Sequence, residues 1–439
     1  MQRITTDIPA RLDRLPWSRW HTLVVLALGI TWILDGLEVT IVGSISGVLE
    51  KHVGLSLTPA QIGSVAALML GGEVAGALTF GYLTDLFGRK KLFMLTLSLY
   101  ALFTVLSGFS WNFSSFALFR FLTGIGIGGE YAGINSAIDE LIPARHRGWA
   151  DLAINSSWWI GTMLGSVESI ILLNPHVINP ALGWRLTFLL GAVLAVAVIL
   201  IRIMVPESPR WLLTHGRVQE ADRVMRQIEA RIGSAAKNPA DPSLKPLTID
   251  LHRRITFSRV VQTLVRRYPR RTVLSMALMI TQAFLYNAIF FTEALVLTTF
   301  FGVPAIDVGY YIFPFAIGNL LGPWLIGSLF DKWGRKIMIA GTYILSGALL
   351  IGTGELFLHH LLSAVTMTAA WSIIFFFASA GASSAYLTAS EVFPVETRAM
   401  AIAFIYAIGT LIGGVAAPPI FAALIATRSV SHVFDGYLL

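Results

Sequence analysis

The chain has 439 residues, of which 55% are hydrophobic and only 13% are charged, whereas soluble globular proteins carry about 25% charged residues. It therefore has too little polar surface for a water-soluble fold and is predicted to be a membrane protein. The formal net charge is +7, but the basic residues stand between long apolar runs, which argues against a nucleic-acid partner.

Several kinds of chemistry are excluded by the residues that the chain lacks. There is no cysteine, so disulfides, thiolate zinc sites and redox motifs are impossible. No His-Glu-x-x-His motif and no Gly-Lys pair occur, which excludes the common zinc-protease motif and a phosphate-binding P-loop. No nucleophile stands at a suitable spacing from a base. We therefore expect no enzyme activity, no metal and no cofactor.

The first predicted element is the apolar run from His21 to Leu49, which follows four arginines. It is about twice as long as a signal-peptide core and lacks a cleavage site, so it is predicted to be a retained transmembrane helix. A spanning helix needs about 20 mostly apolar residues, and ten further segments qualify. The eleven predicted helices centre near Ile33, Ala75, Ala101, Gly126, Met163, Ala195, Phe284, Phe315, Ser346, Phe375 and Leu411. The tail after Arg428 is predicted to begin a twelfth helix that is truncated.

The distribution of lysine and arginine predicts the orientation. With the N-terminus in the cytoplasm, all but four of the 32 basic residues fall on the cytoplasmic side, as the positive-inside rule expects. The exceptions are Lys51, Arg120, Arg185 and Arg428. The chain is therefore predicted to be a multi-pass protein of the plasma (inner) membrane, surrounded by lipid and monomeric.

A polar segment divides the predicted helices into two groups. Residues 217–233 alternate charged and apolar side chains at helical spacing, which predicts a cytoplasmic surface helix, and a proline-rich stretch follows. We expect an N-terminal half over 1–204 with helices 1–6, a cytoplasmic linker over 205–271, and a C-terminal half over 272–439 with helices 7–11 and the start of helix 12.

The two halves contain an internal repeat. The segment GYLTDLFGRKK, which begins at Gly81, matches GSLFDKWGRK 246 residues later, and Gly72 and Gly76 match Gly318 and Gly322 at the same offset. The segment ELIPARHR, which begins at Glu140, matches EVFPVETR 251 residues later. Repeats of this kind are typical of secondary transporters.

These motifs, together with Arg120, Gly124 and the segment PESPRWLLTHGR at 206–217, resemble those of the major facilitator superfamily. Within it, the Glu-x-x-Pro-x-x-x-Arg copies and PESPRWL resemble the sugar-porter and metabolite:proton symporter branches, which include synaptic vesicle glycoprotein-like members. The segments at 35–38 (DGLE) and 128–131 (GGEY) resemble the organic-acid side more. The resemblance covers nearly the whole chain and implies an all-α polytopic bundle of two pseudo-symmetric six-helix halves.

The repeated loops are predicted to act as a cytoplasmic latch. Glycines beside the turns let helices pack closely, and the acidic side chains can pair with nearby arginines. The alternative is a set of solvated loops that only satisfies the positive-inside rule. The residues assigned to this gating are Gly81, Asp85, Gly88, Arg89, Glu140, Arg147, Asp331, Gly334, Arg335, Glu391 and Arg398.

Predicted helix 1 carries two carboxylates one turn apart, Asp35 and Glu38. Charged groups inside a bilayer usually line a pathway or pair with a base. At about 1.5 Å of rise per residue, Asp35 and Arg120 are expected at the same depth. We therefore predict an Asp35–Arg120 pair that breaks when Asp35 is protonated, with Glu38 as a further candidate for proton coupling. Static structural pairing is the alternative.

Polar and aromatic side chains near the midplane are the candidates for solute binding. Sugar porters typically show Gln-Gln-x-x-Gly-x-Asn in helix 7, and this chain keeps the second Gln and the Asn but has Thr281 and Leu285 at the other two positions. For each aromatic, core packing is the alternative to solute contact. The assigned residues are Gln282, Tyr286, Asn287, Asn155, Trp158 and Tyr386.

The glycine-rich segment at 124–130 formally contains the dinucleotide motif Gly-x-Gly-x-x-Gly. That motif requires a soluble strand–helix unit around it, which is absent here, so Gly124 and Gly128 are interpreted as a site of close helix packing.

Together these features predict a secondary active transporter of a small organic solute that works by alternating access. Proton symport and an organic acid or related metabolite are favoured. Two alternatives stay open: a proton-independent sugar facilitator, and a non-transporting sensor built on a transporter fold.

Overall fold

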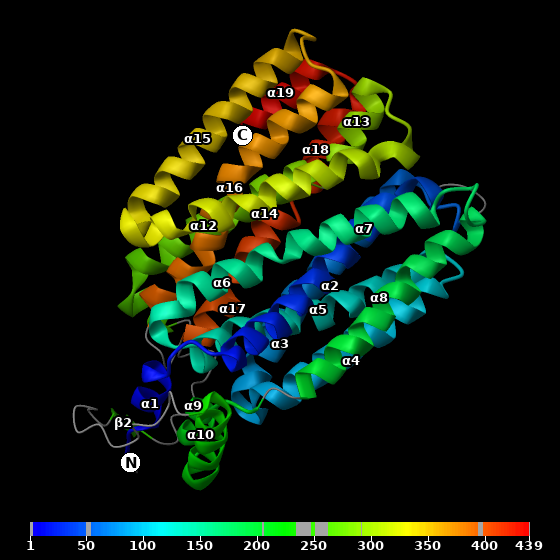
Figure 1. The fold of residues 1–439 in the computed structure, drawn as a ribbon. Helices are drawn as coiled ribbons and strands as arrows, with labels where there is room; N and C mark the ends of the chain where they lie inside the picture. The colour runs from blue at the N-terminus through cyan, green and yellow to red at the C-terminus, as the bar shows by residue number, and fades with distance from the viewer. Residues whose placement is uncertain are drawn as a thin grey trace.

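The computed structural model describes residues 3–49, 54–203, 206–233, 247–250, 262–290, 292–393 and 398–438. Two bundles of long helices lie side by side, and a group of short elements gathers at one end of the molecule, next to the N-terminus (Figure 1). The fold is an all-α polytopic bundle, as predicted.

The first bundle contains the six predicted helices of the N-terminal half. Their bounds are α2 (Arg19–Leu49), α3 (Pro59–Phe87), α4 (Arg89–Gly108), α5 (Phe113–Leu141), α6 (Arg147–Ser156), α7 (Trp158–Leu172) and α8 (Pro180–Ile203). The fifth predicted helix is divided at Ser157, whose hydroxyl donates to the backbone oxygens of Ile154 and, on α2, Gly29. The segment Ala144–His146 forms the short helix η1 before α6. Capping boxes at Thr58 and Asn112 fix where α3 and α5 begin.

The second bundle contains the helices of the C-terminal half. Their bounds are η3 (Thr263–Arg267), α12 (Pro269–Phe290), α13 (Glu293–Phe301), η4 (Ala305–Asp307), α14 (Val308–Lys332), α15 (Arg335–Leu358), α16 (Ala364–Val392), α17 (Arg398–Gly409), η5 (Thr410–Gly414), α18 (Ala417–Ala426) and α19 (Val430–Leu438). The predicted eleventh helix is thus two α-helices joined by the π-helical turn η5. The last helix, α19, packs against α15 and α18.

All eleven predicted centres fall within helices or helical turns. Within the described residues, nine segments are long and apolar enough to cross a membrane. The fourth predicted helix, α5, is less apolar because it contains Arg120 and Glu130, and the fifth is divided into two shorter helices. Large apolar side chains such as Leu26, Leu325 and Ile344 are exposed on the outer faces of the bundles, where a lipid chain would cover them.

The repeat predicted from the sequence has matching geometry in the two bundles. Helices α3 and α5 pack closely in the first bundle, and α14 and α16 do so in the second. Gly88 and Gly334, which are 246 residues apart, have positive φ angles of 99° and 89°, and each precedes a new helix. Glycine adopts such angles without steric cost. The repeated loop is therefore the same turn in both bundles.

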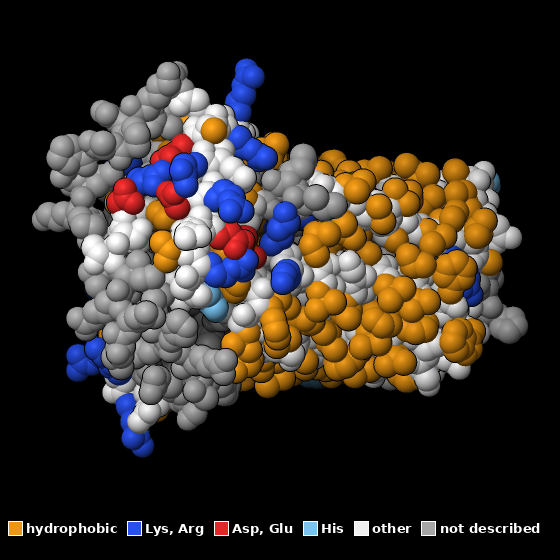
Figure 2. All heavy atoms as spheres, turned by 90° about the horizontal axis from the view of Figure 1, so that it is seen from below, with side chains coloured by type: hydrophobic (Ala, Val, Ile, Leu, Met, Phe, Trp, Pro, Cys, Tyr) orange, Lys and Arg blue, Asp and Glu red, His pale blue; other side chains and the backbone are white. Residues whose placement is uncertain are grey.

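The short elements form a separate layer at one end of the bundles. They are β1 (Arg3–Thr6), α1 (Ile8–Arg14), α9 (Pro209–Thr214), α10 (Val218–Ile232) and β2 (Leu247–Asp250). The strands β1 and β2 pair antiparallel. Charged side chains gather at this end, whereas apolar side chains cover the long sides of the bundles (Figure 2). The predicted surface helix at 217–233 is present as α10.

Candidate functional site

A cavity of about 190 Å³ lies between the two bundles. The first bundle contributes side chains from α2, α3, α5, α6 and α7, and the second contributes α12, α16, α17 and η5. The lining residues are Trp32, Asp35, Val39, Leu70, Glu73, Ile127, Tyr131, Asn155, Trp158, Trp159, Gln282, Ala283, Tyr286, Asn287, Phe290, Ser379, Ala382, Ser383, Tyr406 and Thr410. This space is large enough for a small organic molecule rather than for a single water molecule.

Most of the predicted solute-binding residues meet at this cavity. Asn155, Trp158, Gln282, Tyr286 and Asn287 all line it, although they come from helices far apart in the chain. The sixth candidate lies in α16, but its side chain is outside the described residues; this is Tyr386. The structure thus brings the candidates of predicted helices 5 and 7 to one cavity, from opposite bundles, which sequence spacing alone does not require.

Aromatic rings make up much of the wall. Trp158 and Trp159 pack edge to face at 4.7 Å, and Trp159 also contacts Tyr286 at 5.9 Å. Tyr131 of the first bundle and Tyr406 of the second stack across the bundle interface, with ring centroids 3.9 Å apart and an interplanar angle of 15°. Rings of this kind fit a planar solute and hold it with little loss of side-chain entropy.

Two carboxylates, Asp35 and Glu73, belong to the same wall. The Tyr406 hydroxyl donates a hydrogen bond of 3.4 Å to Glu73 Oε2, so this contact joins the two bundles. No lysine, arginine or histidine is among the described residues that line the cavity. The wall is therefore acidic on the side of the first bundle and neutral on the side of the second.

The predicted Asp35–Arg120 pair is wrong. Arg120 Nη1 donates to Glu38 Oε2 at 2.7 Å, and both side chains are completely buried. Arg120 also contacts Met69 Sδ at 3.1 Å and lies over the Phe188 ring at 5.2 Å. The depth estimate from helical rise has an error of about one turn, which is the separation of Asp35 and Glu38, so it could not choose between them.

The buried cation that interacts electrostatically with Asp35 is Arg202, a partner that the sequence analysis did not predict. Arg202 is 3% exposed, donates to Thr31 Oγ1 at 2.8 Å and lies over the Phe93 ring at 4.3 Å. It interacts electrostatically with Asp35 and Glu130. The sequence analysis counted Arg202 among the basic residues on the cytoplasmic side because it stands at the end of an apolar run. A long side chain near a helix end can reach back into the bundle, and sequence gives no sign of that direction.

The second bundle also contains a buried carboxylate away from the cavity wall. Glu293 at the start of α13 is 1% exposed. Its place nine residues after Phe284, the centre of a predicted helix, puts it near the outer end of that helix, where contact with water is expected. Glu355, for which the same was expected, is exposed and lies near His359.

Only part of the predicted cytoplasmic latch is described. The side chains of Asp85, Arg89, Glu140, Asp331, Glu391 and Arg398 lie outside the described residues. In the first bundle, Glu207 of the PESPR segment accepts from the Lys90 backbone N–H at 3.2 Å, beside Gly88. A carboxylate at a helix N-terminus is stabilising. Gly81 is buried within α3, Gly334 precedes α15, and Arg335 begins it.

The latch arginine Arg147 contacts the N-terminal segment. Its guanidinium donates to Asp13 Oδ1 at 2.7 Å, and Arg210 donates to the other oxygen of Asp13 at 2.8 Å. This contact connects the Glu-x-x-Pro-x-x-x-Arg loop to α1 and α9 in the layer of short elements.

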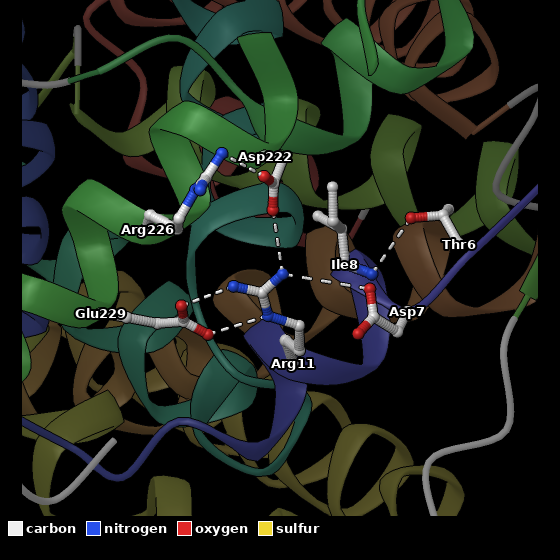
Figure 3. Close-up of polar contacts among 7 residues, drawn as sticks. All are labelled: Thr6, Asp7, Ile8, Arg11, Asp222, Arg226 and Glu229. Atoms are coloured by element: carbon white, nitrogen blue, oxygen red, sulfur yellow. Dashed lines mark hydrogen bonds and ion pairs between the residues drawn. The ribbon is translucent and has the colours of Figure 1, made fainter. Parts of the chain in front are cut away.

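The N-terminal segment is held to the linker by a second cluster (Figure 3). Arg11 binds both oxygens of Glu229 and one oxygen of Asp222, with Asp7 at 4.0 Å. The hydrogen bond to Glu229 raises the pKa of Arg11 above its ordinary value, against the opposing effect of burial. The linker is thus attached to the N-terminus by charged contacts that the sequence analysis did not predict.

Comparison with known proteins places this geometry among transporters. A family model described as "Sugar (and other) transporter" matches residues 33–435. The niacin transporter NiaP of Acinetobacter baylyi is 28% identical over 429 residues, covering 97% of this chain and 92% of that protein. The 4-hydroxybenzoate transporter PcaK of the same organism is 26% identical, covering 93% of this chain and 86% of that protein.

Solved structures show the same fold. The proton:xylose symporter XylE of the major facilitator superfamily, bound to 6-bromo-6-deoxy-D-glucose, superposes with a TM-score of 0.74 at 18% identity, covering 95% of this chain and 93% of that one. The inward-open conformation of XylE from E. coli gives a TM-score of 0.69 at 19% identity, covering 94% and 92% of the two chains.

Proposed function

Since the chain belongs to the sugar (and other) transporter family and has the major facilitator fold, we propose that it carries a small organic solute across the plasma (inner) membrane by alternating access, coupled to proton symport. The observation that supports this most directly is the cavity, which side chains of both bundles line and which contains the buried carboxylate Asp35. A site between two rigid bundles can open to either side as they rock against each other.

Two further contacts join the bundles through α14. The Trp324 indole donates to Ser156 Oγ of α6 at 2.6 Å, and Gly309 at the start of α14 lies against Ser166 and Ile170 of α7. In the proposed mechanism these contacts rearrange as residues 1–204 and 272–439 move against each other, with the repeated loops as the cytoplasmic latch.

The layer of short elements supports the proposed orientation. Charged side chains concentrate there (Figure 2), and the N-terminal segment is part of it. The positive-inside rule associates such an end with the cytoplasm. This supports the proposal that the N-terminus is cytoplasmic.

Proton coupling is assigned to Asp35, with Arg202 as its electrostatic partner and the Glu38–Arg120 pair as a neighbouring buried charge pair. A proton on Asp35 would remove its attraction to Arg202 and change the balance between two arrangements of the helices. A proton can shift the equilibrium between two arrangements of the helices only if it binds one arrangement more tightly than the other. A carboxylate that is open to the cavity in only one arrangement would bind the proton with different affinities in the two.

For the solute, an organic acid or related metabolite is the first class and a sugar or polyol the second. The relatives named for niacin and 4-hydroxybenzoate transport and the aromatic wall support the first class. The amides of Gln282 and Asn287 can bind a carboxylate or a hydroxyl, so they are compatible with both.

The test is accumulation in proteoliposomes of the wild type and of Asp35→Asn, with and without an imposed proton gradient. Proton symport predicts that the wild type concentrates a solute only with the gradient, while Asp35→Asn still exchanges the solute but loses at least tenfold of its accumulation. Accumulation that persists after the gradient is collapsed would contradict symport. Asp35→Asn transport that stays active and insensitive to pH favours a sugar facilitator, and binding without flux favours a sensor.

A further inference from the structure

The cavity has an acidic corner that proton coupling through Asp35 does not require. Glu73 of α3 lines the cavity and is 6% exposed. Its Oε2 accepts the hydrogen bond from Tyr406 of the other bundle. A carboxylate at this place has a large desolvation cost unless it binds a partner, and one hydrogen bond of 3.4 Å offsets little of that cost.

The backbone beneath Glu73 is held in place by a helix crossing. A Cβ added to Gly128 would lie 1.9 Å from the Glu73 carbonyl oxygen, and one added to Gly124 would lie 3.2 Å from the Glu73 nitrogen. The glycines of the segment 124–130 thus let α5 approach α3 at Glu73. This contact positions the carboxylate at the cavity before any solute arrives, which lowers the cost of binding.

Aromatic faces surround this corner. Tyr131 and Tyr406 stack beside it, and Trp32 packs edge to face on Tyr131 at 5.1 Å. All three rings line the cavity together with Glu73. Aromatic faces attract cations, most strongly where water is excluded. A carboxylate among such faces is a suitable environment for a positively charged nitrogen.

No protein cation is available to neutralise this corner among the described residues that line the cavity. Arg120 interacts electrostatically with Glu73, but it is fully buried and bound to Glu38 at 2.7 Å. Asp35 is the second carboxyl group of the same wall. An ionised Glu73 would repel an anionic group and attract a positively charged group of the solute.

We propose that the solute carries a positively charged nitrogen on or beside a planar ring, and that Glu73 receives this nitrogen and determines specificity for it. The acid group of such a solute would bind the neutral amides of Gln282 and Asn287 on the other wall. A zwitterion has no net charge, which reduces the electrostatic cost of entering a site of this charge. The inference rests on the proposed function only in taking the cavity as the solute site, and Asp35 stays available for the proton.

The experiment measures binding to purified protein in detergent, without any gradient, so that it is independent of proton coupling. The probes are benzoate, 3-(aminomethyl)benzoate, 1-methylpyridinium-3-carboxylate and neutral benzamide. We expect the wild type to bind the two zwitterions, 3-(aminomethyl)benzoate and 1-methylpyridinium-3-carboxylate, about tenfold or more tightly than benzoate, the range of a charge-assisted contact. In Glu73→Gln this preference should fall to about threefold or less, with benzamide binding retained as evidence of an intact fold.

Glu355→Gln is the control, because it removes an exposed carboxylate that is not among the residues lining the cavity. It should keep the preference for the two zwitterions, and Glu73→Asp should keep part of it. The proposal is overturned if neither zwitterion binds the wild type, if benzoate binds as tightly as they do, or if the preference is kept in Glu73→Gln. If Glu73→Gln does not fold, Glu73→Ala replaces it, and an unchanged preference in that variant overturns the proposal. Failure of proton-driven accumulation in liposomes would count against symport alone.

Discussion

The two bundles share one scaffold but differ in charge at equivalent positions. In the first, Gly72 and Gly76 of α3 lie against the carbonyl oxygens of Phe121 and Ile125 of α5. In the second, the equivalent glycines of α14 meet the equivalent carbonyls of α16. These residues are Gly318, Gly322, Ser372 and Phe376. The same offsets of 246 and 251 residues that define the sequence repeat therefore relate the two helix crossings.

The charges do not follow this symmetry. The position equivalent to Glu73 is Asn319, a fully buried amide that accepts a hydrogen bond from Tyr286 at 3.1 Å. The position equivalent to Arg120 is Trp371, which is also fully buried. The comparison shows that the repeat preserves helix packing, while the charges at these positions occur in the first bundle only. We interpret the first bundle as the half that couples protons and the second as the half that recognises neutral groups of the solute.

The largest expected effect comes from breaking the charge pair of the first bundle. Arg120→Leu leaves the buried Glu38 carboxylate without its partner, and removing one member of a buried pair typically costs about 3–5 kcal/mol. Thermal unfolding in detergent measures the loss. The double variant Glu38→Gln with Arg120→Leu should recover much of it, because no uncompensated charge remains. If Arg120→Leu lowered the free energy of unfolding by less than about 1 kcal/mol, the Glu38–Arg120 pair would not be the buried charge pair that we assign to the first bundle.

The shared scaffold predicts equal effects in both bundles. A Cβ at Gly76 would lie 2.1 Å from the Ile125 oxygen, and one at Gly322 would lie 1.9 Å from the Phe376 oxygen. Overpacking of this kind typically costs about 1–3 kcal/mol, so Gly76→Ala and Gly322→Ala should lower the unfolding temperature by similar amounts. Gly347→Ala is the control, since nothing lies within 4 Å of its Cβ position. Clearly unequal losses would contradict the proposed equivalence.

A smaller effect is expected from the neutral wall of the second bundle. Asn287 lines the cavity and donates to the Ala283 carbonyl oxygen at 2.7 Å, which orients its amide. Asn287→Ala should weaken solute binding about three- to tenfold, the range of one neutral hydrogen bond, and leave the dependence on the proton gradient unchanged. Isothermal titration and liposome accumulation measure the two quantities, with the exposed Thr299→Ala as control. If Asn287→Ala made accumulation independent of the proton gradient, the proposed division into a proton-coupling first bundle and a solute-recognising second bundle would be contradicted.

The smallest effect concerns the repeated loop. Glu207 accepts from the start of α4 in the first bundle, whereas no atom of the described residues lies within 4 Å of a Cβ at the equivalent Gly334. Glu207→Gln should cost about 0.3–1 kcal/mol locally, through the weaker interaction with the helix N-terminus. Hydrogen exchange should become faster at the start of α4 and stay unchanged at the start of α15. Exposed Glu220→Gln is the control, and equal changes at both helix starts would argue against a local capping role.

The positions of the helices could be predicted from the sequence because a segment in a bilayer has to satisfy its backbone hydrogen bonds internally, as a helix does. Length and hydropathy therefore located all eleven predicted helices, and the repeat of Gly81–Lys90 identified the fold. The divisions at Ser157 and at the π-helical turn Thr410–Gly414 were not predicted, because a local break in a helix depends on the neighbours that satisfy its freed groups.

Side-chain partners were harder to predict than helices. Arg120 was expected to bind Asp35 and binds Glu38. Arg202 was counted on the cytoplasmic side and is buried inside the first bundle. Glu293 was expected to contact water and is buried. In each case the error is about one helical turn, or the reach of one long side chain, and helix tilt and rotation of that size leave no trace in sequence spacing.

The sequence by itself determined that this protein is a helical membrane transporter, since composition, apolar run lengths and the repeated glycine turns constrain the chain locally. Only the tertiary structure decided that five of the six proposed solute-binding residues share one cavity, that Glu73 joins them, and that the wall from the first bundle is acidic while the facing wall is neutral. The physical reason is that the cavity is formed by helices packed from distant parts of the chain, and the direction of each side chain there is fixed by contacts across the two bundles.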